Sequence, residues 1–159
     1  MTTRLTPYLN FREGARGAME FYQSVFGGDL TVSTFGDTPG MGLDEAEKDK
    51  VLHSMLVVGP DMTLMAADVP DAMPVSANGT LTLSGQDEAQ LRRYWDKLSA
   101  DGTVGVPLEK APWGDAFGMC TDRSASPGWS TSSAPARERF PPGHRPLIAD
   151  PDGRSTSGA

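Results

Sequence analysis

Apolar residues recur at helical spacing in two stretches of the chain. In residues 15–26 they fall at i, i+3, i+4, i+7, i+10 and i+11, and Gly27-Gly28 follows. Residues 87–98 also show helical spacing, begin with Asp87-x-x-Gln90 in the pattern of a capping box, and are followed by Gly102. Each stretch presents one apolar face, so the sequence predicts two amphipathic helices packed against a core.

Short apolar or alternating runs predict the strands. Seven such runs are present, at residues 5–11, 30–35, 51–58, 62–67, 80–84, 104–108 and 117–121. Proline, glycine and acidic residues separate them in 36–49 and 68–79, which predicts a mobile loop and a crossover. The order is a strand, a helix and three strands, followed by a second copy that has one strand fewer. This is an internal repeat of about 73 residues, in which each half needs the other to bury its sheet.

The segment from Gly102 to Arg123, GTVGVPLEKAPWGDAFGMCTDR, carries the most specific motif. It resembles the second half of a glyoxalase/bleomycin-resistance (vicinal oxygen chelate) domain of the PhnB-like subfamily. There the phrase GG-x-V-x-x-P-L-x-x-x-x-W-G-x-x-F-G-x-x-x-D leads into a last strand, roughly FGVPWMVNI. The resemblance implies an α+β fold of paired βαβββ modules in residues 1–123, with halves at about 3–70 and 79–123.

The composition changes after Arg123, where serine, proline, glycine and arginine dominate and apolar periodicity stops. A GC-rich coding text for Arg-Phe-Gly-Val-Pro-Trp-Met-Val-Asn-Ile, with one T deleted, translates as Arg-Ser-Ala-Ser-Pro-Gly-Trp-Ser-Thr-Ser. That is the sequence of residues 123–132. We therefore interpret 124–159 as an irregular, frameshifted tail and expect the final strand to be missing. A natural linker of biased composition is the alternative.

Charge and cysteine content limit the function classes. Residues 1–123 hold 10 basic and 18 acidic residues, a net charge of −8, which argues against nucleic acid and anionic membranes as partners. No apolar run is long enough to span a bilayer, and no signal peptide is evident. The single cysteine, Cys120, excludes an internal disulfide, so a cytoplasmic setting is expected. Its apolar neighbours predict a buried, inert thiol.

His53 is the only histidine in residues 1–123. Metal-using members of the superfamily that the chain resembles place histidine and glutamate ligands on four symmetric strands. A second histidine is missing from the matching positions here, so we expect no metal centre and no cofactor. His53 is either a strand histidine hydrogen-bonded to backbone or a residue that contacts ligand or exchanges protons.

The other candidate residues are aromatic, thioether or acidic. Trp113, with Asp115, lies on a loop and either stacks on a ligand or packs as a lid. The predicted ligand-binding set is Tyr8, His53, Met55, Trp113, Asp115 and Phe117. Two functions remain open: a homodimer that binds a small, partly apolar molecule without chemistry, and a metal-independent or atypical enzyme (lyase, isomerase or dioxygenase-like) that uses His53 as acid or base. Met62, Met65 and Met119 are expected in the core.

Overall fold

The computed structural model describes residues 6–38, 44–75, 77–110, 116–124 and 128–132. They form, in chain order, β1 (Tyr8–Phe11), α1 (Ala15–Phe26), β2 (Asp29–Thr34), β3 (Val51–Val58), β4 (Met62–Asp68), β5 (Thr80–Ser84), α2 (Glu88–Ser99), β6 (Thr103–Lys110), β7 (Ala116–Thr121) and β8 (Gly128–Ser132). Two short 3-10 turns, Phe35–Asp37 and Glu45–Glu47, lie in the segment 36–49 that was expected to be a loop, except that the first begins at Phe35, the last residue of the predicted strand. None of the helices in these ranges is long and apolar enough to cross a membrane.

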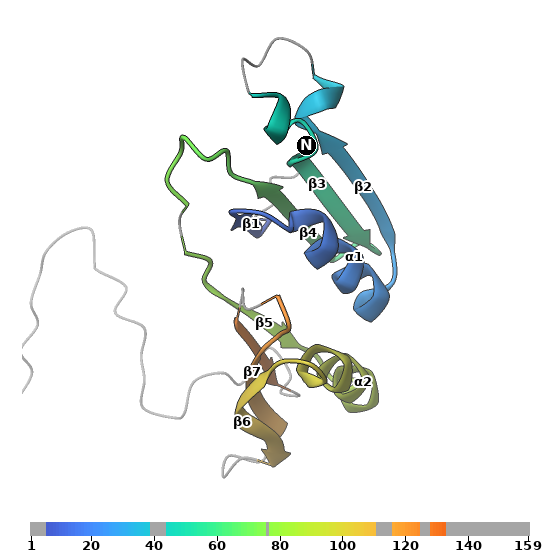
Figure 1. Ribbon diagram of the computed structural model, residues 1–159. Coiled ribbons are helices and arrows are strands. Elements are labelled where there is room, and N and C mark those ends of the chain that lie inside the picture. Colours follow the sequence, from blue (N-terminus) through green and yellow to red (C-terminus); the bar gives the residue numbers. More distant parts are fainter. Residues whose placement is uncertain (1–5, 39–43, 76, 111–115, 125–127, 133–159) are drawn as a thin grey trace, which may run out of the picture.

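The strands form two four-stranded sheets with the same topology. The N-terminal sheet has the order β1-β4-β3-β2 and the C-terminal sheet the order β5-β8-β7-β6 (Figure 1). In each sheet the first and fourth strands of the module pair in parallel, and the other neighbours are antiparallel. This confirms the predicted α+β fold and its internal repeat of βαβββ modules.

The final strand is present, so the expectation that it is missing is wrong. β8 pairs in parallel with β5 and antiparallel with β7, and Trp129 stands opposite both Leu81 and Cys120. Backbone groups make these ladder bonds, so a serine-rich segment can occupy the slot. Trp129 and Thr131 alternate along β8 and are both buried, which gives the strand one inward face. Residues 133–159 lie outside the described ranges.

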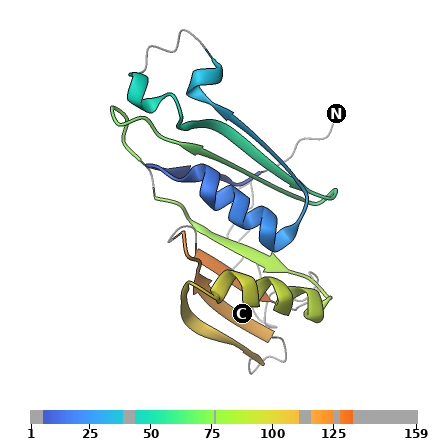
Figure 2. The ribbon, with the colours of Figure 1, turned by 45° about the vertical axis from the view of Figure 1, so that its right-hand side comes forward.

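The core joins the two modules through aromatic side chains of the helices. The ring of Trp129 lies 5.6 Å from those of Tyr22 and Phe26 on α1, between ring centroids. Phe26 also meets Tyr94 of α2 edge-on, at 5.0 Å. In Figure 2, α1 (blue) lies along the N-terminal sheet and α2 (yellow-green) along the C-terminal sheet, and the two helices are in contact. Such ring pairs add to the stabilisation that burial itself supplies.

One glycine of the C-terminal motif has a clear packing role. A Cβ added at Gly118 would lie 2.9 Å from the ring of Trp95 and 2.8 Å from the Cα of Leu108. Glycine is therefore required where β7 meets both α2 and the adjacent β6. Trp95 of α2 belongs to the buried core, and Leu108 of β6 packs against that core.

Candidate functional site

The N-terminal sheet has one face covered by α1 and one that α1 leaves open. Leu9 and Phe11 of β1 belong to the buried core, whereas Tyr8 is 45% exposed. Because side chains alternate along a strand, Tyr8 lies on the face opposite α1. We call this surface the open face of the N-terminal sheet, and its members that matter here are Tyr8, His53, Met55 and Met65.

Three of the predicted ligand-binding residues come together on this open face. The rings of Tyr8 and His53 lie 6.1 Å apart, between centroids, although they come from β1 and β3. Met65 of β4 is in register with both Tyr8 and Met55, which makes one row across three strands. The Tyr8 phenol is protonated at neutral pH and can donate a hydrogen bond, and partial burial raises its pKa further above the ordinary value.

Val51 does not share this face, although strict alternation along β3 would put it on the same side as His53. The register of β2 against β3 shifts between Ser33 and Thr34, so that Ser33 pairs with His53 and Thr34 with Val51. Val51 is 1% exposed and its backbone N–H donates to the buried Asp68 at 2.8 Å. The irregularity therefore turns the start of β3 toward the core.

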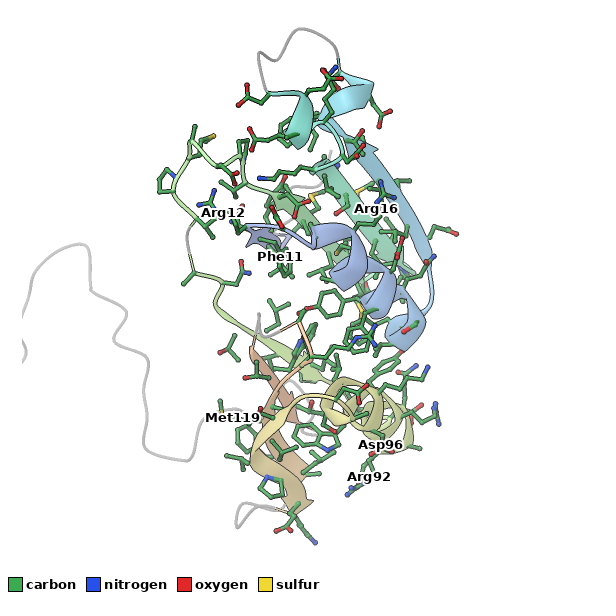
Figure 3. All side chains as sticks on the ribbon, in the orientation of Figure 1. Phe11, Arg12, Arg16, Arg92, Asp96 and Met119 are labelled. Atoms are coloured by element: carbon green, nitrogen blue, oxygen red, sulfur yellow. The ribbon has the colours of Figure 1, made fainter. Side chains whose placement is uncertain are left out.

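Of the remaining predicted ligand-binding residues, only Phe117 is among those that the structure describes, and it does not join this group. Phe117 stands on β7 of the C-terminal sheet, and Trp113 and Asp115 lie outside the described residues. Met119, expected in the core, is 39% exposed, and in Figure 3 it projects on the side opposite to Arg92 and Asp96 of α2. The C-terminal sheet therefore also has an open face, on which Met119 is in register with Val106.

Two pockets lie away from these residues. One, of about 440 Å³, opens between α1 and the end of β7 and is lined by Phe11, Gly14, Gly17, Ala18, Phe21 and Ser124, with Glu13 and Arg123. Another, of about 650 Å³, lies between the start of β1, the β3–β4 turn and β5, where Pro7, Asp61, Met62 and Leu83 line it. Neither includes Tyr8, His53, Met55 or Phe117, so sequence reasoning did not find these two cavities.

A buried carboxylate organises the region beside the first pocket. Asp122 is 2% exposed and accepts hydrogen bonds from the Tyr22 hydroxyl at 2.9 Å and from the Trp129 indole N–H at 2.6 Å. The backbone N–H of Ser124 donates to its other oxygen at 2.7 Å. Burial raises the pKa of Tyr22 far above its ordinary value, so Tyr22 remains a donor. The sequence signal was available, because Asp122 is the last residue of the recognised phrase.

Comparison with known proteins agrees with this architecture. The sequence profile of the Glyoxalase/Bleomycin resistance protein/Dioxygenase superfamily matches residues 8–126. The chain belongs to this superfamily. Protein PA1353 from Pseudomonas aeruginosa is 32% identical, with a TM-score of 0.74 over 83% of this chain and 98% of PA1353.

Two further proteins are similar to this chain, one in sequence and one in fold. Protein YjdN of Escherichia coli (strain K12) is 26% identical over 133 residues, which cover 77% of this chain and 90% of YjdN. The PhnB protein from Bacillus cereus is 24% identical, with a TM-score of 0.58 over 83% of this chain and 100% of PhnB, a likeness of fold. A PhnB protein is thus among the structures that this chain resembles.

The described residues do not fit a superfamily metal centre of the histidine–carboxylate type. No group of three histidine, cysteine, aspartate or glutamate side chains that could hold a metal ion occurs among them. His53 has a tyrosine as its ring neighbour, and methionines stand on the adjoining positions of the open face. Phenol and thioether groups are poor partners for histidine around zinc or a similar ion.

Cys120 is buried on β7, as predicted. Burial, with a smaller contribution from Asp122, raises the pKa of its thiol above the ordinary value. The thiolate, which is the reactive form, is therefore disfavoured, and we assign Cys120 a packing role.

Proposed function

We propose that the protein binds a small, partly apolar molecule on the open face of its N-terminal sheet, without a metal centre. The juxtaposition of Tyr8 and His53 across two strands supports this, because it sets an exposed aromatic ring beside a polar one. Met55 and Met65 extend the surface with flexible, polarisable side chains that adapt to irregular ligands. An apolar surface with a few polar groups is typical of small-molecule sites.

The proposal includes a homodimer in the cytoplasm. In the single chain both open faces carry exposed apolar side chains, among them Tyr8, Val106 and Met119. A second copy that covered these faces would remove apolar surface from water and enclose the ligand. Phe117, Trp113 and Asp115 remain proposed ligand contacts in that assembly.

A second candidate function is acid–base catalysis by His53. The observation that favours it is the neighbouring Tyr8 phenol, which is protonated at neutral pH and able to donate to a substrate oxygen. An imidazole can exchange a proton with the same substrate. The two candidate functions share one site. They differ in whether the bound molecule is released unchanged or as a product.

The test is a thermal-shift and ligand-observed NMR screen of the full chain against small aromatic and oxygenated aliphatic compounds. We expect hits whose binding is lost in Tyr8→Ala and Met55→Ala and kept in Glu20→Gln. Glu20 is an exposed residue of α1, on the other side of the sheet. Hits that bind Tyr8→Ala and Met55→Ala as well as wild type, or a screen without hits, would contradict the proposed site.

Mass spectrometry of each hit after incubation separates the two functions. A compound recovered unchanged from wild type supports binding alone. Conversion that wild type performs and His53→Gln does not perform supports acid–base catalysis. Equal conversion by both proteins would remove His53 from the mechanism.

A further inference from the structure

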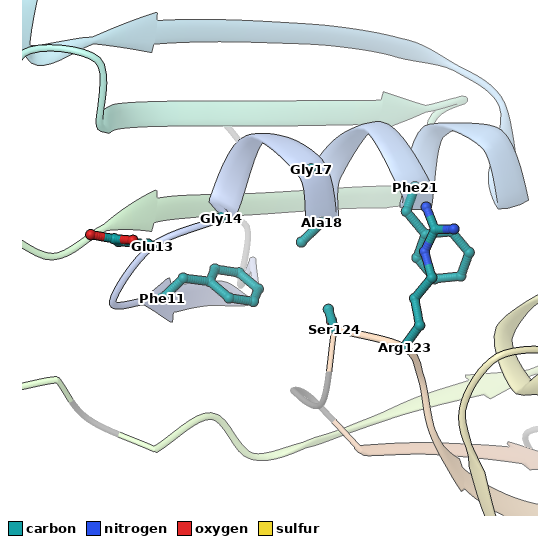
Figure 4. A pocket seen from close by; sticks show the side chains of 8 residues that line it. All are labelled: Phe11, Glu13, Gly14, Gly17, Ala18, Phe21, Arg123 and Ser124. Atoms are coloured by element: carbon teal, nitrogen blue, oxygen red, sulfur yellow. The ribbon is translucent and has the colours of Figure 1, made fainter.

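The pocket between α1 and the end of β7 has the features of a second ligand site, separate from the open face. Figure 4 shows its position, with Phe11 beneath α1 and the Phe21 and Arg123 side chains together at one end. Its volume of about 440 Å³ lies within the usual range for small-molecule sites. The lining residues come from β1, α1 and the segment after β7, so the pocket depends on both modules.

The side walls of this pocket are apolar and suit a flat ring. Phe11 and Ala18 are buried members of the core, and Phe21 packs against the same cluster. Gly17 leaves the helix wall open, because a Cβ added there would meet no atom within 4 Å. Aromatic walls favour an aromatic guest in offset or edge-on contact.

Arg123 gives the pocket a fixed cationic end. Its guanidinium carbon lies 4.2 Å from the centroid of the Phe21 ring, a cation–π contact that orients the planar head. Among the described residues, Arg123 forms no salt bridge with a carboxylate. A guanidinium presents parallel N–H groups that match a carboxylate.

The other polar groups determine which way round a guest would bind. Glu13 lies at the end of the pocket opposite Arg123 in Figure 4, so an anionic group is favoured only at the Arg123 end. The Ser124 hydroxyl is already within hydrogen-bond distance of Tyr22 and Asp122. Ser124 therefore fixes the turn that carries Arg123.

We propose that this pocket binds a single-ring aromatic carboxylate, with its ring between Phe11 and Phe21 and its carboxylate on Arg123. The proposal is independent of the open-face site. The two sites differ in their residues, since none of Tyr8, His53 and Met55 lines this pocket.

Titration of the full chain with benzoate, followed by NMR and calorimetry, tests the proposal. We expect saturable binding that Arg123→Met weakens at least tenfold. Arg92→Met is the matched control, because Arg92 is also exposed and lies on α2 in a pair with Glu88. It should bind benzoate as wild type does. Benzyl alcohol, which lacks the charge, should bind more weakly and respond little to Arg123→Met.

Gly17→Leu tests the cavity from the helix side. It places a side chain in the open space beside Gly17, at a helical position where leucine is better tolerated than glycine. We expect benzoate binding to be lost while the melting temperature does not fall. Absence of saturable binding to wild type, or unchanged affinity in Arg123→Met or Gly17→Leu, would overturn the proposal. Tyr8→Ala should bind benzoate normally, and loss of binding there would assign benzoate to the open face instead.

Discussion

The indole nitrogen of Trp129 donates a hydrogen bond to Asp122 Oδ2 at 2.6 Å, and both side chains are buried. This bond ties β8 to the residue that follows β7. The hydroxyl of Tyr22 donates to the same oxygen, so that α1 is held at the same point. A buried carboxylate is tolerated only where donors surround it, and here β8 provides one of them.

The bond predicts that Trp129→Phe will destabilise the fold by about 2–3 kcal/mol, since it removes a donor to a buried charge and part of a core ring. Urea denaturation measures the loss. Trp95→Phe is the matched control, because Trp95 is also buried and has no hydrogen bond through its ring in the described residues. A loss in Trp129→Phe no larger than that in Trp95→Phe would show that the hydrogen bond contributes nothing.

A second prediction concerns Thr131, whose hydroxyl is buried without a hydrogen-bond partner among the described residues. A buried hydroxyl without a partner costs about 1–3 kcal/mol. Thr131→Val keeps the shape and removes the hydroxyl, so we expect the free energy of unfolding to rise by about 1 kcal/mol. Thr131→Ser keeps the hydroxyl and loses the methyl group, and it should be less stable than wild type. A fall in stability for Thr131→Val would indicate that the hydroxyl has a partner in solution.

Sequence periodicity predicted the elements well where apolar residues carry the information. The helix α1 spans residues 15–26, as expected, and β3 and β5 begin and end at the predicted residues. β8 was missed because its five residues include three serines or threonines and one glycine, so no apolar alternation marks it. The resemblance places a last strand at this position, but this segment can form it only by pairing with β5 and β7, and β5 is distant in sequence.

The candidate sites were predictable only in part. Alternation placed His53 and Met55 on one face, but the contact between Tyr8 and His53 depends on the parallel pairing of β1 with β4. The pocket at Arg123 could not be foreseen, because it needs α1 and the segment after β7 to meet. Long-range packing of this kind leaves no periodic signal in the sequence.

A third prediction concerns how the free energy of unfolding changes as the pH is lowered. The Lys50 ammonium contacts Glu47 at 3.0 Å and Asp71 at 2.7 Å. The backbone N–H of Asp71 and then Lys50 lower the pKa of Glu47, and Lys50 lowers the pKa of Asp71. A carboxyl group whose pKa is lower in the folded state stabilises the fold at pH values above its pKa in the unfolded chain. That stabilisation is lost as the pH falls through its pKa in the folded state.

Lys50→Met should therefore melt below wild type at pH 7, and the difference should shrink as the pH falls below about 4, the ordinary carboxyl range. Melting curves from pH 7 down to acid measure it. Lys48→Met is the control, because Lys48 pairs with Glu45 at a far more exposed position and should show a smaller difference. A difference between Lys50→Met and wild type that is constant with pH would contradict the assignment.

A fourth prediction is that the purified protein carries no stoichiometric transition metal. The physical reason is the donor set around His53, which offers a phenol and thioethers in place of further imidazole or carboxylate ligands. Elemental analysis of protein prepared without chelator gives the metal content. About one zinc, iron or nickel ion per chain that disappears in His53→Ala would show that the ligands come from elsewhere in the assembly and that the prediction is wrong.

The last prediction is that the chain associates through its open faces. Val106 and Met119 are in register on β6 and β7 and are 40% and 39% exposed. Adjacent apolar side chains on an uncovered sheet face are a common feature of protein–protein contacts. Light scattering at micromolar concentration should give the mass of a dimer.

Met119→Glu places a charge on this surface, and burying an unpaired carboxylate at an interface is unfavourable. We therefore expect the mass of Met119→Glu to move toward that of the monomer while its circular dichroism stays unchanged. Arg93→Glu is the control, because Arg93 is exposed on α2, away from the open face, and should remain dimeric. A monomeric wild type would contradict the dimer itself. A dimeric Met119→Glu would show that the C-terminal open face is not the contact. The N-terminal open face, with Tyr8, would then be the surface to test, by Tyr8→Glu.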